Sequence, residues 1–151
     1  MNQIDILRQT RQNILDAVEG LSNRQLNTIP QGFNNSIAWN IGHVVVTQQL
    51  LVYRLSNSPL YISDEMVDKF RKGSNAGIVS EEEMVELKRL LLELVAKFEQ
   101  DSSEGVFGRF NDYPTSYGLT LKTVEDAVKF NSVHEALHLG YIMAQKRALL
   151  H

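Results

Sequence analysis

Histidine is the residue type in this sequence whose positions most directly suggest chemistry. There are four, at His43, His134, His138 and His151. His134 and His138 are four residues apart, so on a helix both side chains lie on one face, one turn apart. Two imidazoles in this arrangement can clamp one metal ion, because each ring nitrogen must approach the ion to about 2.0–2.1 Å. The alternative is a partly buried core histidine that is hydrogen-bonded to a neighbour.

The rest of the composition excludes or argues against several other kinds of site. The sequence has no cysteine, which excludes disulfides, zinc ribbons, iron–sulfur ligation and a thiol nucleophile. Its 15 Lys and Arg against 18 Asp and Glu give a net charge of −3, which argues against nucleic-acid binding and against a polybasic membrane anchor. No apolar run approaches the roughly 18 residues of a membrane span, and the first residues lack the pattern of a secretory signal. We therefore expect a soluble, cytoplasmic protein.

Four long amphipathic segments must position these histidines. They cover residues 2–19, from 34 or 35 to 55, from 80 to about 101, and from 120 or 123 to 149. No segment shows sustained alternation of apolar and polar residues, so the sequence gives little support to a sheet. At 151 residues, with 43% hydrophobic and 22% charged residues, the chain fits one globular domain over residues 1–151. The predicted fold class is all-α, a helical bundle.

Several helix ends are also readable. Gly20 is well placed to stop the first helix, and Asn34 or Asn35 is a suitable N-cap for the second. Ser80 and Glu83 form a capping box at the start of the third helix. Ser22 and Gln25 offer a smaller one for a single turn, and a short helix is expected within residues 64–72.

The predicted fourth helix carries its histidines on the core-facing side. Residues at steps of three and four make one stripe of Val124, Ala127, Val128, Asn131, His134, His138 and Tyr141. Two imidazoles on this stripe point into the bundle, where unpaired polar groups are costly. A metal ion would satisfy both. His43, in the middle of the second helix beside Gly42, also requires a partner.

Two motifs resemble a known family. Trp39-Asn40-Ile41-Gly42-His43 resembles the helix-two motif of the DinB-like (YfiT-like) superfamily, and residues 134–142 resemble its helix-four signature, a histidine pair followed by a glycine. Tyr117-Gly118 and Thr123 fit the lead-in to that signature, and the resemblance extends over essentially the whole chain. It implies an up-down-down-up four-helix bundle in which His43, His134 and His138 are the ligands of one metal ion.

The resemblance also implies a function. The family includes thiol-dependent enzymes such as bacillithiol transferases and mycothiol-dependent maleylpyruvate isomerase. This favours a metal-dependent enzyme that transfers a low-molecular-weight thiol to a small electrophilic substrate. A metal-dependent hydrolase, or a non-catalytic, stress-linked metal-binding bundle, remains the alternative. Histidine ligation is compatible with zinc, nickel or iron. Because members are often homodimers, a homodimer is expected here too, with Ile142, Met143 and Leu149 flanking the inward stripe.

Other residues are interpreted by their position along the helices relative to the histidines. Four of them could line a substrate pocket, although packing or hydrogen bonding to the ligands explains each equally well: Asn40, Thr47, Asn131 and Tyr141. Glu135 projects about 100° away from His134, at about 3.6 residues per turn, and is expected to be a solvated surface charge rather than a base. Trp39 is interpreted as a core anchor rather than a substrate platform. The pair Arg71-Lys72 is interpreted as the solvated end of a helix.

Overall fold

The structure is a computed structural model that describes residues 1–151, and it is mostly helical. Its elements in chain order are α1 Gln3–Val18, α2 Asn23–Asn27, α3 Ile37–Gln48, the π-helix η1 Gln49–Arg54, α4 Asp64–Phe70, α5 Glu81–Glu104, β1 Tyr113–Pro114, β2 Thr120–Leu121 and α6 Val124–Leu150. The two strands pair antiparallel and form a small hairpin. The predicted all-α class is confirmed.

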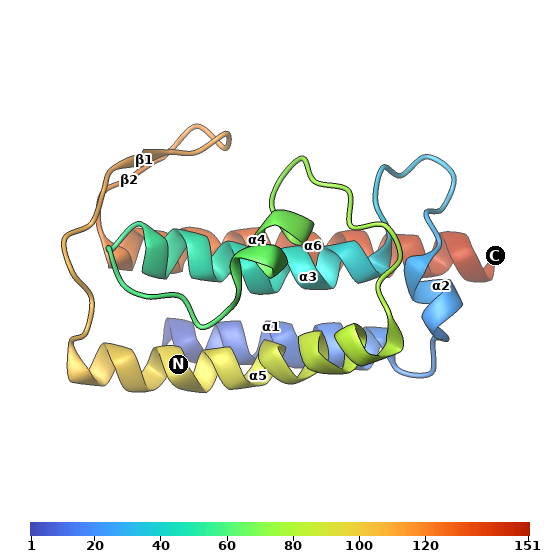
Figure 1. Cartoon of the computed structure of the whole chain (residues 1–151), viewed down its shortest axis with the longest axis horizontal. Helices are drawn as coiled ribbons and strands as arrows, with labels where there is room; N and C mark the ends of the chain where they lie inside the picture. Colours follow the sequence, from blue (N-terminus) through green and yellow to red (C-terminus); the bar gives the residue numbers. More distant parts are fainter.

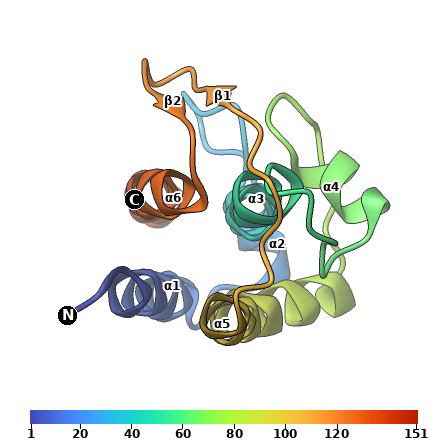
Figure 2. The same cartoon turned by 90° about the vertical axis from the view of Figure 1, so that its left-hand side faces the viewer.

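The four long helices form a bundle of two layers. Seen end-on, α3 and α6 make one layer, and α1 and α5 make the other (Figure 2). The chain runs in one direction along α1 and α6 and in the opposite direction along α3 and α5 (Figure 1). This is the expected up-down-down-up order. It sets α3 antiparallel to α6, so the middle of one helix faces the middle of the other.

Side-chain caps define where most helices begin. Ser80 accepts a hydrogen bond from the backbone of Glu83, and the Glu83 carboxylate accepts one from the backbone of Ser80, as the predicted capping box requires. The prediction that Asn34 or Asn35 caps the second helix is wrong. Ser36 is the N-cap of α3, because its hydroxyl accepts from the backbone N–H of Trp39 at 3.1 Å.

The second predicted helix changes its winding after Gln48. Residues Gln49–Arg54 continue it as η1. Here backbone N–H groups bond to the carbonyl five residues earlier, as from Leu55 N to Leu50 O at 3.3 Å. Both Gln48 and Gln49 are buried there. The wider turn admits two consecutive polar side chains to the interior, which the spacing of apolar residues does not reveal.

The apolar core lies between the layers and gives the site its rigid support. Its largest cluster joins Ile37 and Ile41 of α3, Leu87 and Leu91 of α5, and Ile142 of α6, all essentially inaccessible to solvent. A second cluster around Tyr53 and Phe98 closes the end of the bundle near the hairpin. The histidines therefore stand on two helices that are packed along most of their length.

Candidate metal centre

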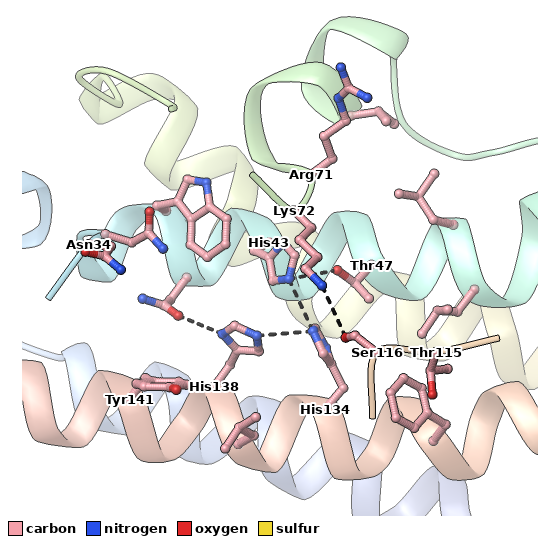
Figure 3. Close-up of a pocket in the computed structure, with 18 of the residues that line it drawn as sticks. Asn34, His43, Thr47, Arg71, Lys72, Thr115, Ser116, His134, His138 and Tyr141 are labelled. Carbon is pink, nitrogen blue, oxygen red and sulfur yellow. Dashed lines mark hydrogen bonds between the residues drawn. The ribbon is translucent and has the colours of Figure 1, made fainter. Parts of the chain in front are cut away.

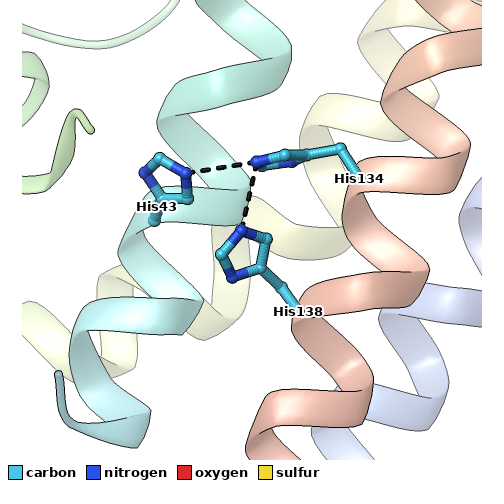
Figure 4. Close-up of side chains that lie close together, drawn as sticks. All are labelled: His43, His134 and His138. Carbon is cyan, nitrogen blue, oxygen red and sulfur yellow. Dashed lines mark hydrogen bonds between the residues drawn. The ribbon is translucent and has the colours of Figure 1, made fainter. Parts of the chain in front are cut away.

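Three histidines from the two facing helices converge on one point. Nε2 of His134 lies 3.2 Å from Nε2 of His43 and 3.1 Å from Nε2 of His138 (Figure 4). The predicted spacing of four residues puts His134 and His138 on one face of α6, and α3 brings His43 opposite them. One nitrogen from each ring lies within 4.8 Å of the others. His151 is exposed at the end of the chain and takes no part.

The outer ring nitrogens fix the orientation of two of these imidazoles. Nδ1 of His43 donates to the backbone carbonyl of Phe70 at 2.8 Å, since a carbonyl can only accept. Nδ1 of His138 donates to Oδ1 of Asn40 at 2.7 Å. Asn40 is itself oriented by its amide group, which donates to the carbonyl of Ser36 and to Oε1 of Gln145. Both Nε2 atoms therefore present lone pairs to the shared point.

This arrangement leaves an electron-rich point, where the donors within reach are one N–H of His134 and the hydroxyl of Thr47. Nε2 of His134 faces two acceptors and can donate to at most one of them. Nδ1 of His134 is buried and has no hydrogen-bond partner. Nitrogens that ligate one ion tetrahedrally at about 2.0–2.1 Å are about 3.3 Å apart, close to the two separations observed. The three histidines thus fit a metal ion in chemistry, and the two separations from His134 fit its spacing.

Burial keeps the three rings neutral, which is the form that binds a metal. Burial, followed by the nearby charge of His43, lowers the pKa of His138 to about 4. Burial, followed by the charges of His138 and His43, lowers the pKa of His134 to about 2. The pKa of His43 is also lowered by burial, against a partial opposing effect of its bond to Phe70.

Trp39 and Gly42 shape the surroundings of His43. The Trp39 ring stacks on His43 with centroids 4.4 Å apart, and its Nε1 donates to Ser74. Trp39 is buried, as a core anchor should be, and it also lines the pocket described below. Gly42 allows α4 to come close, because a Cβ at this position would lie 2.3 Å from the Phe70 ring. The glycine beside His43 is therefore a contact point for the residue whose carbonyl orients His43.

A pocket of about 1110 Å³ opens over the three histidines (Figure 3). Its walls are the segment before α3, one side of α3 and η1, the end of α4, the β1–β2 hairpin and α6. Asn40, Thr47 and Tyr141 line it, and Oγ1 of Thr47 is 3.3 Å from Nε2 of His43. Asn131 does not line the pocket. It is fully buried and donates to Glu135.

The prediction that Glu135 is a solvated surface charge is wrong. Glu135 and Arg11 form a fully buried ion pair with an N–O distance of 2.6 Å. Arg11 also donates to the carbonyl of Leu91 and to Oε1 of Gln48, so the pair ties α1 and α6 to their neighbours. The sequence does contain a sign of a buried charge in α1, where Arg11 lies on the apolar stripe between Leu7 and Ile14. Spacing within one helix could not show that this stripe meets Glu135.

The fold and the site together define a helical-bundle protein with a three-histidine cluster that could hold a metal ion. Residues 6–142 match the DinB superfamily, and since the match spans most of the chain, the protein belongs to that superfamily. No curated protein matches the sequence. None of the helices has the length and apolar character that crossing a bilayer requires.

Proposed function

We propose that the protein is a metal-dependent enzyme, with His43, His134 and His138 holding one divalent transition metal ion beside a small-molecule pocket. The observation that carries this proposal is the convergence of the three Nε2 atoms at the floor of the pocket. When bound, the ion would supply Lewis acidity and lower the pKa of a water or thiol beside it. Zinc, nickel and iron all suit imidazole ligands.

The polar groups around the cluster favour thiol transfer to an electrophile over hydrolysis. A hydrolase needs a base to activate water, and the carboxylates near the site are already engaged. Glu135 is paired with Arg11 away from the pocket, and Asp68, the one carboxylate that lines it, is paired with Arg71 at 3.5 Å. A low-molecular-weight thiol, with a pKa near 8.5, needs much less assistance to ionise.

Different walls of the pocket suit different parts of such substrates. Leu50, Leu51 and Phe130 provide an apolar wall on one side of the histidines, suited to the body of a small electrophile. Asn40 holds His138 in place, and Phe70 does the same for His43. The Thr47 hydroxyl stands beside His43 and can donate to a bound anion. The apolar wall and Thr47 would bind the substrates, Asn40 and Phe70 orient the histidines, and the thiol would be the nucleophile.

The experiment that tests this proposal is a screen of tag-free, metal-loaded protein against pairs of thiols and electrophiles. Consumption of both substrates by the wild-type protein, and its loss in His43→Ala, would support the proposal. His151→Ala is the matched control, since this histidine lies outside the cluster, and it should keep full activity. A protein that binds metal but turns over no pair would instead be a non-catalytic metal-binding bundle.

We also propose that two copies assemble as a homodimer through the outward face of α6. Val133 and Met143 are about half exposed on this helix, and a Cβ at Gly140 would meet no atom within 4 Å. An exposed apolar helix face with an open glycine allows another helix to approach closely. This face lies beside the pocket, because Leu137 and Tyr141 of the same helix line the pocket.

A further inference from the structure

Lys72 is the cationic residue of the pocket that no carboxylate neutralises. The charged residues lining the pocket are Arg54, Asp68, Arg71 and Lys72. Arg54 pairs with Asp64, and Arg71 pairs with Asp68, each at 3.5 Å. Lys72 forms no ion pair, and its Nζ donates a hydrogen bond to Oγ of Ser116 at 3.2 Å. The pocket therefore contains one positive charge without an opposite partner.

The position of this charge relates it to the histidine cluster. Lys72 follows the C-terminal end of α4, and Ser116 comes from the β1–β2 hairpin on the other side of the opening. In Figure 3 the ammonium group of Lys72 points into the pocket, whereas the guanidinium group of Arg71 points away from the histidines. Thr47 borders the same pocket, 3.3 Å from Nε2 of His43. One ammonium and two hydroxyl groups thus line the same pocket as the cluster.

We propose that this part of the pocket is a subsite for a carboxylate group of the substrate, with Lys72 as its charged contact and Ser116 and Thr47 as hydroxyl donors. The proposal rests on the proposed function, since it takes the histidine cluster as the place where the reacting end of that substrate is held. A single ammonium group matches a single negative charge. The two arginines of the pocket, which could hold a phosphate by two parallel bonds, each contact a carboxylate at 3.5 Å, and Arg71 points away from the histidines (Figure 3).

The substrate class that fits is a small carboxylic acid bearing a thiol. Its sulfur would lie at the cluster and its carboxylate at Lys72, so the two ends are recognised by different groups. Because Lys72 is exposed, the preference for a charged over a neutral ligand should be a factor of about two to five and should shrink at high salt. The hydrogen bond between Lys72 and Ser116 shows that the ammonium already reaches across the opening.

The test compares 3-mercaptopropionate with its methyl ester, two thiols that differ by one negative charge. Each is titrated calorimetrically into nickel-loaded protein at low ionic strength. Wild type should bind the acid about two to five times more tightly than the ester. Lys72→Met and Lys72→Gln should bind both equally, whereas Lys72→Arg should keep the preference. Lys88→Met, on α5 outside the pocket, is the matched control and should behave as wild type.

Equal affinity of wild type for acid and ester, or an undiminished preference in both neutral Lys72 variants, would overturn the subsite. Nickel affinity is measured first for every variant, and the Lys72 variants should retain it because Lys72 is not a ligand. If wild type binds no nickel, the proposed function fails. The subsite is then tested on metal-free protein by ligand-observed NMR with 3-mercaptopropionate. Contacts that depend on Lys72 would support it, and contacts indifferent to Lys72 would refute it.

Discussion

The backbone carbonyl of Phe70 accepts a hydrogen bond from Nδ1 of His43 at 2.8 Å, and this bond turns Nε2 of His43 toward the two histidines of α6. The short helix α4 thus orients a side chain on α3, although the two residues are 27 positions apart in sequence. A histidine that ligates a metal commonly donates its other ring proton in this way, and the bond fixes both the tautomer and the ring plane.

Gly42→Ala should weaken metal binding without removing any ligand. The new methyl group would overlap the Phe70 ring, so α4 must move and take its carbonyl away from His43. Loss of such a partner typically costs about 10–100-fold in metal affinity. Calorimetric titration with nickel or zinc measures the change.

Gly140→Ala is the matched control for this substitution. Gly140 is also a helical glycine, but its added Cβ meets no atom within 4 Å. Its metal affinity should equal that of wild type, because Gly140 does not contact the histidines or Phe70. The helix of the single chain should be more stable by about 0.5–1 kcal/mol, whereas the added methyl group on the proposed dimer face should weaken the dimer. Equal metal affinities for Gly42→Ala and wild type would show that Phe70 does not position His43.

Glu135→Gln should destabilise the fold strongly, because it leaves the buried Arg11 without a counter-charge. Breaking a buried ion pair from one side costs about 3–5 kcal/mol. The double variant Arg11→Met, Glu135→Leu should lose less than either single variant, since it leaves no isolated buried charge. Urea unfolding of the metal-free proteins measures these differences. A cost below about 1 kcal/mol for Glu135→Gln would be that of a solvated surface charge, contrary to this structure.

Much of this fold is predictable from the chain itself. The apolar stripes of α1, α3 and α5, the Ser80–Glu83 capping box and the shared face of His134 and His138 are local patterns that the structure has. The predicted stripe of α6 is correct only in part, since Tyr141 is about half exposed and Glu135 is buried. The role of His43 does not follow from a local pattern. Its position in the middle of a helix indicates that it needs a partner but does not identify the partner, and only the family resemblance connects it with His134 and His138.

The parts that sequence patterns missed all depend on contacts between distant segments. Arg11 and Glu135 are 124 positions apart, and neither helix by itself shows that they meet. The winding of η1 buries Gln49, whose Oε1 accepts from the backbone of Tyr61 in the following connection. Lys72 is exposed at the end of α4, as predicted, but its hydrogen bond to Ser116 of the β1–β2 hairpin is a contact that the sequence pattern does not show.

The stability of the metal-free protein should fall as the pH is lowered below about 6.5. Burial lowers the pKa of His138 to about 4, so the unfolded chain takes up a proton near pH 6.5 while the folded protein does not. The stabilisation is complete above pH 6.5 and is lost between pH 6.5 and about 4, with up to about 3 kcal/mol from this residue. Urea unfolding at several pH values, with a chelator present, measures the slope.

His138→Asn should have a shallower slope over this pH range, because one of the groups that protonates preferentially in the unfolded chain is gone. His151→Asn should keep the wild-type slope, since this terminal residue is exposed. A wild-type slope in His138→Asn would mean that burial does not hold this imidazole neutral.

The proposed homodimer predicts a particle mass in solution of about twice 17.2 kDa. Val133→Glu and Met143→Glu place charges on the outward face of α6 and should shift the equilibrium toward monomer. Light scattering at micromolar concentration measures the mass. A wild-type mass near that of one chain would exclude a stable dimer.

The most direct measurement is a metal titration of tag-free protein by calorimetry, comparing wild type with single alanine variants of His43, His134, His138 and His151. Wild type should bind one nickel or zinc ion per chain. Each of the first three substitutions should lower the affinity steeply, and His151→Ala should leave it unchanged. Binding of the same metals with equal affinity by wild type and by the His43→Ala, His134→Ala double variant would contradict the three-histidine site.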